Sequence, residues 1–315
     1  MKKFVLGKTG MEVTELCFGA LPLGPLQKNI SLADGAELIR QALDKGINFI
    51  DTAQLYRTYP YIKEALKGFT DEVIIATKSV AQSYEAMDKS VQEALSAMGR
   101  DHIDIFHLHA ARVEGNIFEN RSGAIECLKD YKKKGIVRAI GISTHMVELV
   151  HDATKNEDID IIFPIINKIG MGIVDGTAED MIAAIKKADA AGKGLYAMKA
   201  LAGGHLIDEI QEAYDYVRKI QGISSVAVGM VNKKELDLNL RFFNDEEVAP
   251  EDLPIKAADK KLIVSMFCKG CGKCVGTCPN TALSLQEGKA IVDVNKCILC
   301  GYCNPVCPEF ALRLA

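Results

Sequence analysis

The region from residue 16 to about 241 alternates short β-branched runs with longer segments of helical period, and this alternation restricts the folds open to the chain. The predicted strands cover residues 16–20, 47–51, 73–77, 103–109, 137–142, 159–166, 195–200 and 225–229. Eight strand-helix pairs in about 230 residues match a (β/α)8 TIM barrel in number and length. A doubly wound open sheet is the alternative, because spacing alone does not exclude it.

Segments of a different character flank the predicted barrel. The opening stretch FVLGKTGMEV places Gly7 and Gly10 between two extended runs, which predicts a hairpin on the bottom of the barrel. After residue 245 the repeat gives way to a charged stretch that contains prolines. We therefore expect a barrel over 1–245, a linker or packing segment over 246–265, and a cysteine-rich module over 266–315.

The module holds eight of the ten cysteines, which repeat the pattern C-x2-C-x2-C-x3-C-P twice. This is the run of bacterial ferredoxins, in which three cysteines bind one 4Fe-4S cluster and the fourth ligates the other. The two predicted ligand sets are Cys268, Cys271, Cys274 and Cys307 for the first cluster, and Cys297, Cys300, Cys303 and Cys278 for the second. Zinc is the structural alternative, but a zinc site needs neither the third C-x2-C step nor the terminal C-P. The remaining Cys17 and Cys127 match no ligand pattern and are expected to be buried apolar residues.

Four polar residues stand at the ends of predicted barrel strands, where catalytic side chains gather in this architecture. Asp51 and Tyr56 follow the second strand, Lys78 follows the third, and His109 ends the fourth. Each alone could be an ordinary structural residue, but their order and spacing together predict a site. His107 shares the inward parity of His109 and is interpreted as structural.

The stretches GINFIDTAQLY, ATK, IDIFHLH and KKGIVRAIGIS resemble the aldo-keto reductases over roughly residues 4–241. With the cysteine run, the resemblance implies a TIM barrel joined to a small C-terminal α+β ferredoxin-like domain that carries two 4Fe-4S clusters. In the implied tetrad Tyr56 protonates the carbonyl oxygen and Lys78 lowers the pKa of Tyr56. Asp51 holds Lys78, and His109 orients the substrate. A neighbouring cation is needed because an unperturbed phenol titrates near about pH 10.

The resemblance also implies NADP(H), with NAD(H) as the alternative, bound across the barrel mouth without a Rossmann glycine motif. The cofactor contacts carried over by motif are Ser143, Thr144, Asn167, Met198, Lys199, Leu201, Gly203, Gly229, Lys233, Glu235 and Asn239. Met198 replaces a tyrosine expected to stack on the nicotinamide, Phe163 replaces a glutamine, and Lys199 replaces a serine near the pyrophosphate. A lysine at 233 beside the ribose favours NADPH over NADH.

The formal net charge of −4, with scattered Lys and Arg, predicts neither nucleic-acid nor anionic-membrane binding. No apolar run reaches the roughly 18 residues of a membrane span, and the N-terminus lacks a signal-peptide core, so we expect a cytoplasmic protein. The expected partners are a small-molecule carbonyl or alcohol substrate and a redox protein.

These features predict an NAD(P)H-dependent oxidoreductase that is coupled to, or carries, two iron–sulfur clusters for electron transfer. Hydride transfer moves two electrons whereas a cluster passes one, and no flavin-binding signal is present to connect them. Two alternatives therefore stay open. The clusters could only stabilise the C-terminal region, or the barrel could be the binding platform of an electron carrier or redox sensor.

Overall fold

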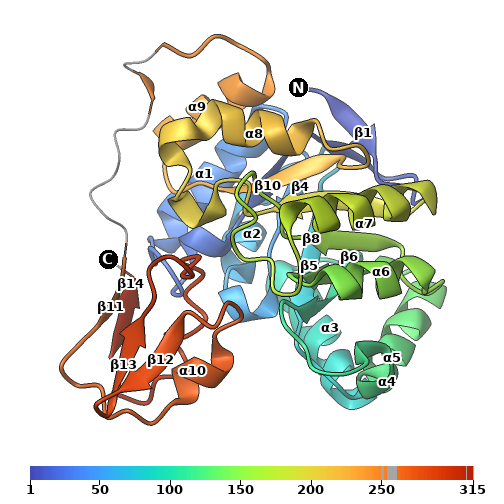
Figure 1. The fold of residues 1–315 in the computed structure, drawn as a ribbon. Helices are drawn as coiled ribbons and strands as arrows, with labels where there is room; N and C mark the ends of the chain where they lie inside the picture. The colour runs from blue at the N-terminus through green and yellow to red at the C-terminus, as the bar shows by residue number, and fades with distance from the viewer. Residues whose placement is uncertain (250–251, 254–260, 310, 315) are drawn as a thin grey trace.

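The computed structural model describes residues 1–249, 252–253, 261–309 and 311–314, and its largest part is a closed barrel (Figure 1). Among these residues, eight parallel strands close in the order β10-β3-β4-β5-β6-β7-β8-β9. Their bounds are β3 Leu16–Gly19, β4 Phe49–Asp51, β5 Ile74–Ser79, β6 Ile103–Ala110, β7 Val137–Thr144, β8 Ile161–Pro164, β9 Gly194–Met198 and β10 Ser225–Gly229. The predicted TIM barrel is confirmed, and the open sheet is excluded.

Helices cover the outside of the barrel and bury one apolar face each. Ser31 caps the first of them, because its side chain accepts a hydrogen bond from the N–H of Asp34. The helices are α1 Leu32–Asp44, α2 Tyr59–Ala65, α3 Tyr84–Met98, α4 Ile117–Asn120, α5 Ser122–Lys133, α6 Val147–Lys155, α7 Ala178–Ala190, α8 Ile210–Arg218 and α9 Lys233–Phe243. Short 3-10 turns are η1 Leu21–Leu23, η2 Gln54–Tyr56, η3 Ala202–Gly204 and η4 Ile207–Glu209. None of the described helices is long and apolar enough to cross a bilayer.

The bottom of the barrel is covered by the predicted hairpin. Its strands β1 (Lys3–Val5) and β2 (Glu12–Thr14) pair antiparallel, and Leu6 and Met11 are buried among the interior side chains of the barrel strands. Gly7 lies at φ +51°, and a Cβ there would collide with the backbone at Gly194. The hairpin therefore packs directly on the barrel backbone.

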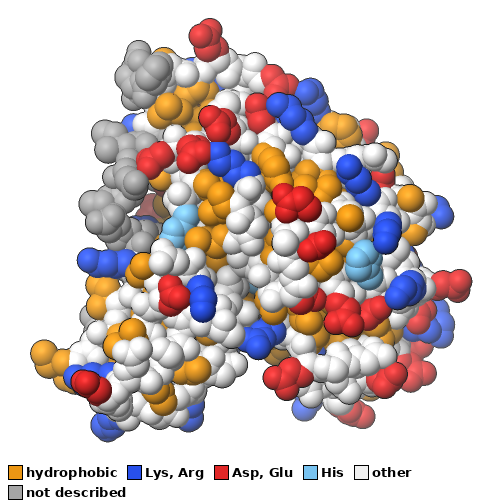
Figure 2. All heavy atoms as spheres, in the orientation of Figure 1, with side chains coloured by type: hydrophobic (Ala, Val, Ile, Leu, Met, Phe, Trp, Pro, Cys, Tyr) orange, Lys and Arg blue, Asp and Glu red, His pale blue; other side chains and the backbone are white. Residues whose placement is uncertain are grey.

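The cysteine-rich module lies beside the barrel in Figure 1, at the red end of the colour bar. Its elements are β11 Leu262–Val264, α10 Lys273–Thr277, β12 Leu283–Gln286, β13 Lys289–Val292 and β14 Leu312–Leu314, with β11 paired to β14 and β12 to β13. Figure 2 shows the module as a separate lobe, and Lys and Arg are interspersed with Asp and Glu over this face of the protein. Of the expected linker 246–265, residues 250, 251 and 254–260 lie outside the described part of the chain.

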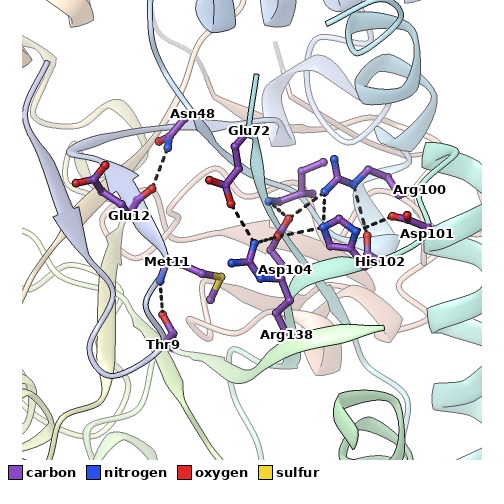
Figure 3. A network of polar contacts seen from close by, with 11 residues as sticks. Thr9, Met11, Glu12, Asn48, Glu72, Arg100, Asp101, His102, Asp104 and Arg138 are labelled. Carbon is purple, nitrogen blue, oxygen red and sulfur yellow. Dashed lines mark hydrogen bonds and ion pairs between the residues drawn. The ribbon is translucent and has the colours of Figure 1, made fainter. Parts of the chain in front are cut away.

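A buried carboxylate joins three strands at the bottom of the barrel (Figure 3). Asp104, at the start of β6, has 1% of its side chain exposed and accepts a hydrogen bond of 2.9 Å from the N–H of Ile75. Arg138 Nη1 donates to Asp104 Oδ1 at 2.7 Å, and Arg100 Nη2 donates to Oδ2 at 3.3 Å. Because Ile75 lies on β5 and Arg138 on β7, this side chain ties both neighbours to β6.

Replacing this carboxylate should destabilise the barrel. Asp104→Ala leaves a buried N–H unpaired and two guanidinium groups without their partner, and we expect a loss of about 3 kcal/mol. Asp101→Ala is the matched control, since the Asp101 side chain is 93% exposed and bonds only His102 in this network, so its loss should change stability far less than the loss of Asp104. Urea unfolding followed by far-ultraviolet circular dichroism measures both, and equal losses would contradict the assignment.

Candidate active site and cluster sites

The four predicted tetrad residues meet at the C-terminal mouth of the barrel. Asp51 is the last residue of β4, Lys78 and His109 lie near the ends of β5 and β6, and Tyr56 ends η2. All four are buried, with exposures between 1% and 6%. The rings of Tyr56 and His109 pack edge to face, with centroids 6.0 Å apart. The parallel register of neighbouring strands is what brings residues 27 to 58 positions apart in the chain to one place.

Lys78 and Asp51 form a buried ion pair. The ammonium donates to Asp51 Oδ1 at 2.9 Å, to Oδ2 at 2.7 Å, and to the carbonyl of Thr52 at 2.6 Å. Burial lowers the pKa of Lys78 and raises that of Asp51, and their mutual attraction opposes both shifts. The pair keeps the two charged forms together in a site that would otherwise disfavour each.

Tyr196 extends this network deeper into the barrel and did not figure among the predicted site residues. Its hydroxyl donates to Asp51 Oδ1 at 2.9 Å and lies 2.7 Å from Nε2 of His107. Its ring stacks on Phe163 at 3.9 Å between centroids. Side chains alternate between the inside and the outside of the barrel along a strand, and this alternation places residue 196 inside. It was the sequence signal that could have identified Tyr196. His107, interpreted as structural, supports Tyr196 from below.

The pKa of the Tyr56 phenol is raised, whereas a lowered pKa was expected from the sequence. Burial raises the pKa of Tyr56 well above its ordinary value, and Tyr302, Asp51 and Cys300 raise it further. The expected lowering by Lys78 is therefore not found, because burial, the largest cause, acts in the opposite direction. Lys78 Nζ lies 5.0 Å from the centre of the Tyr56 ring. Tyr56 is a neutral proton donor in this arrangement.

Tyr302 of the cysteine-rich module enters the same pocket. Its hydroxyl lies 3.0 Å from His109 Nε2 and 3.3 Å from the hydroxyl of Tyr56. Burial raises the pKa of Tyr302, so this hydroxyl also keeps its proton. No local pattern in the sequence pointed to this residue, because its role in the pocket depends on how the module docks.

The residues expected at the nicotinamide end are buried. Ser143 and Thr144 end β7, and Met198 ends β9 with partial exposure. The side chain of Asn167 is committed to its own loop: it accepts from the N–H of Met171 at 2.9 Å and donates to the carbonyl of Met171 at 2.8 Å. The amide of Asn167 is therefore engaged within the barrel itself.

The residues expected near the pyrophosphate lie under the module. Lys199 is partly buried, and desolvation lowers its pKa, while the nearby thiols of Cys300 and Cys297 act in the opposite direction. A Cβ on Gly203 would collide with the carbonyl of Ile298, and Leu201 packs beside it in the core. A pyrophosphate group at Gly203 would therefore meet the backbone of Ile298 while the module is docked.

The residues expected at the adenosine end gather at the start of α9, outside the module contact. The carboxylate of Glu235 accepts from the N–H of Val231 at 2.9 Å. Asn239 accepts from the hydroxyl of Tyr214 at 2.6 Å and donates to the carbonyl of Glu235 at 2.8 Å. Lys233 is exposed and pairs with Asp237 at 3.4 Å. Gly229 is exposed, and a Cβ there would collide with the ring of Pro22. These groups serve contacts within the barrel wall.

Eight cysteines of the module line two separate hollows. The first hollow is lined by Cys268, Cys271, Cys274 and Cys307, and the second by Cys278, Cys297, Cys300 and Cys303. In the described part of the chain no three His, Cys, Asp or Glu side chains are grouped to hold a single metal ion. The N–H groups of Ala290, Ala311 and Ala282 donate to the sulfurs of Cys268, Cys307 and Cys278 at 3.3–3.4 Å.

The donor set and the crossed arrangement therefore fit two 4Fe-4S clusters. Each hollow takes three cysteines from one half of the module and one from the other, as the spacing predicted. Cys17 and Cys127, which match no ligand pattern, are fully buried in the barrel as expected.

Three buried imidazoles near the pocket should make stability depend on pH. Burial lowers the pKa of His107 and His109 well below its usual value and that of His145 to about 3. The unfolded chain takes up protons below about pH 6.5 while the folded protein does not, so stability falls as the pH drops through that range. The slope should reach about 4 kcal/mol per pH unit for three imidazoles.

Urea unfolding at several pH values measures this slope. His145→Asn should reduce it by about 1.4 kcal/mol per pH unit, because one of the three protons is no longer taken up. A free energy of unfolding that stays flat between about pH 6.5 and 5 would show that the imidazoles take up protons equally in the folded and unfolded protein, and would contradict the lowered pKa values.

Comparison with known proteins agrees with this architecture. The model of the aldo/keto reductase family matches residues 15–244, and that of the 4Fe-4S dicluster domain matches residues 267–311. Over 174 residues the chain is 28% identical to the uncharacterized oxidoreductase YqkF of Bacillus subtilis, covering 50% of this chain and 54% of that protein. Over 219 residues it is 29% identical to L-galactose dehydrogenase of Arabidopsis thaliana, covering 65% and 66%.

The matches thus span between half and two thirds of the length of these relatives. The holo form of aldo-keto reductase AKR11C1 from Bacillus halodurans shares the fold, with a TM-score of 0.65 and 22% identity over 80% of this chain and 94% of that one. Because the family model covers most of the barrel-forming chain, the protein belongs to the aldo/keto reductase family, with a 4Fe-4S dicluster domain joined to the C-terminal side of its barrel.

Proposed function

We propose that this protein is an oxidoreductase that interconverts small-molecule carbonyl compounds and alcohols at the barrel mouth, with electrons carried by its two clusters. The observation that carries the proposal is the position of Tyr302. In the sequence it lies between Cys300 and Cys303, two expected ligands of the second cluster, and its hydroxyl contacts both Tyr56 and His109. The first cluster site includes the exposed Cys271, which suits electron exchange with a redox protein partner.

Residues at the barrel mouth orient the carbonyl oxygen of the substrate, protonate it and stabilise its developing charge. Tyr56 donates the proton that ends on oxygen, and the neutral imidazole of His109 orients the carbonyl beside it. Lys78, held by Asp51, supplies a fixed positive charge near the oxygen as negative charge develops there. The clusters, when bound, supply electrons one at a time.

The reaction balances without a further cofactor. Reduction of a carbonyl to an alcohol consumes two electrons and two protons. The electrons originate from two molecules of a reduced one-electron carrier, which are each oxidised once. One proton comes through Tyr56, which water reprotonates, and the proton on carbon comes from water.

NADP(H), with NADPH preferred over NADH, stays a prediction from the family resemblance. Of its expected pyrophosphate contacts, Gly203 lies against Ile298 of the module and Lys199 lies near Cys297 and Cys300. No step of the proposed reaction therefore passes through a dinucleotide.

Tyr56→Phe tests the proton donor. With reduced methyl viologen as electron source and a panel of aldehydes and ketones, we expect alcohol formation to fall about 10²–10⁴-fold without loss of iron. Tyr59→Phe is the matched control, since Tyr59 is also buried but its hydroxyl bonds Thr77 at 2.7 Å outside the pocket. An undiminished rate in Tyr56→Phe contradicts the assignment. Failure of every substrate would favour the electron carrier or redox sensor.

Cys278→Ala tests the electron route. Although Cys278 lies in the first cysteine run, it lines the second hollow, so its loss should remove the second cluster and halve the iron content. Viologen-driven alcohol formation should stop while the first cluster still shows its reduced EPR signal. Cys127→Ala, a buried cysteine in α5, should leave both clusters and the rate unchanged.

A further inference from the structure

The loop from Cys297 to Cys303, which carries three ligands of the second cluster, is seated in the barrel mouth. We call it the cluster-II loop. Ile298 is 2% exposed and belongs to the main hydrophobic core of the barrel. The ring nitrogen Nε2 of His205 lies 3.0 Å from the carbonyl of Cys297, and Asn304, just after the loop, donates to the carbonyl of Leu26 at 3.4 Å. The barrel therefore holds this loop by both apolar packing and hydrogen bonds.

Glycines on both sides make the contact close. Gly203 of the barrel has φ +73°, and a Cβ there would collide with the carbonyl of Ile298. Gly301 of the loop has φ +81°, and its Cβ would collide with the carbonyl of Leu26. Each surface lacks a side chain where the other's backbone arrives, which indicates a contact built for docking.

The loop covers the groups expected to hold a dinucleotide and reaches the groups expected to hold the substrate. Gly203, expected near the pyrophosphate, lies against the backbone of Ile298 instead, and Lys199 lies near Cys297 and Cys300. The hydroxyl of Tyr302 lies between Tyr56 and His109, where a carbonyl oxygen would otherwise be bound.

We propose that the cluster-II loop takes the place of the nicotinamide dinucleotide at the barrel mouth, so that the docked protein binds no NADP(H) and the pocket exchanges electrons with the second cluster directly. The inference rests on the proposed function for the identity of the reaction. Each carbonyl reduced takes two single electrons from an external one-electron carrier, in place of one hydride, and the two protons are supplied as above.

Direct binding measurements give the first test. Isothermal titration of the anaerobic, cluster-loaded full-length protein with NADPH and with NADH should show no saturation up to about 1 mM, the upper end of usual KM values. Saturable micromolar binding of either dinucleotide to this protein would overturn the proposal. This measurement needs no substrate, so its result is independent of the Tyr56 experiment.

Releasing the loop gives the second test. In Ile298→Glu a charge is forced into the apolar seat, so hydrogen–deuterium exchange at residues 199–204 should rise. Viologen-driven alcohol formation should then fall to background while iron content and reduced cluster EPR signals are kept. Ile291→Glu is the matched control on the exposed side of β13, with 43% of Ile291 exposed, and should behave as the wild type.

A second pair of variants acts from the barrel side, away from the cluster ligands, in case Ile298→Glu fails to load its second cluster. Gly203→Ala should release the loop, whereas Gly204→Ala, also at positive φ but with nothing within 4 Å of its Cβ, should not. Full viologen-driven turnover in a variant whose loop is released would overturn the proposal. Loss of turnover in Tyr56→Phe with micromolar NADPH binding to the wild type would retain the reductase function and reject only this inference.

Discussion

A lysine ammonium with 1% of its side chain exposed cannot remain charged in a protein interior unless it is paired and hydrogen-bonded. In this barrel Asp51 and the carbonyl of Thr52 meet that requirement for Lys78, and Tyr196 fixes the carboxylate from the other side. The pair spans β4 and β5, so it sets the relative position of the strand ends from which Tyr56 and His109 reach the pocket. The geometry of proton transfer depends on this one buried interaction.

The docked module changes the chemistry available at that geometry. Without it the pocket would be an open mouth, and the phenol of Tyr56 would be hydrated. With Tyr302 seated against it, burial raises the pKa of Tyr56, and Tyr302 and Cys300 of the module raise it further. A pocket of the aldo/keto reductase family thus lies against a 4Fe-4S dicluster domain within a single chain.

The sequence predicted what depends on local pattern. Strand parity and repeat length predicted the barrel, polar residues at strand ends predicted the four side chains that meet at its mouth, and cysteine spacing predicted the two groups of four that line the hollows. It could not predict contacts between parts of the chain that share no pattern, such as that of Tyr302 with His109, which are 193 residues apart. The proton affinity of Tyr56 was misjudged for the same reason, because it depends on burial by the docked module. The dinucleotide contacts were predicted from the motifs of the family resemblance. That prediction assumes that no other part of the chain covers the barrel mouth.

The crossed ligation has a consequence for assembly and damage. Cys307 serves the first hollow and Cys278 the second, so neither cluster can be completed until nearly the whole module has been synthesised. Loss of one cluster to oxygen would also free one cysteine, Cys307 or Cys278, that lies in the sequence run of the other cluster. Because the loop that carries Cys297, Cys300 and Cys303 lies in the barrel mouth, assembly of the second cluster would take place beside the pocket.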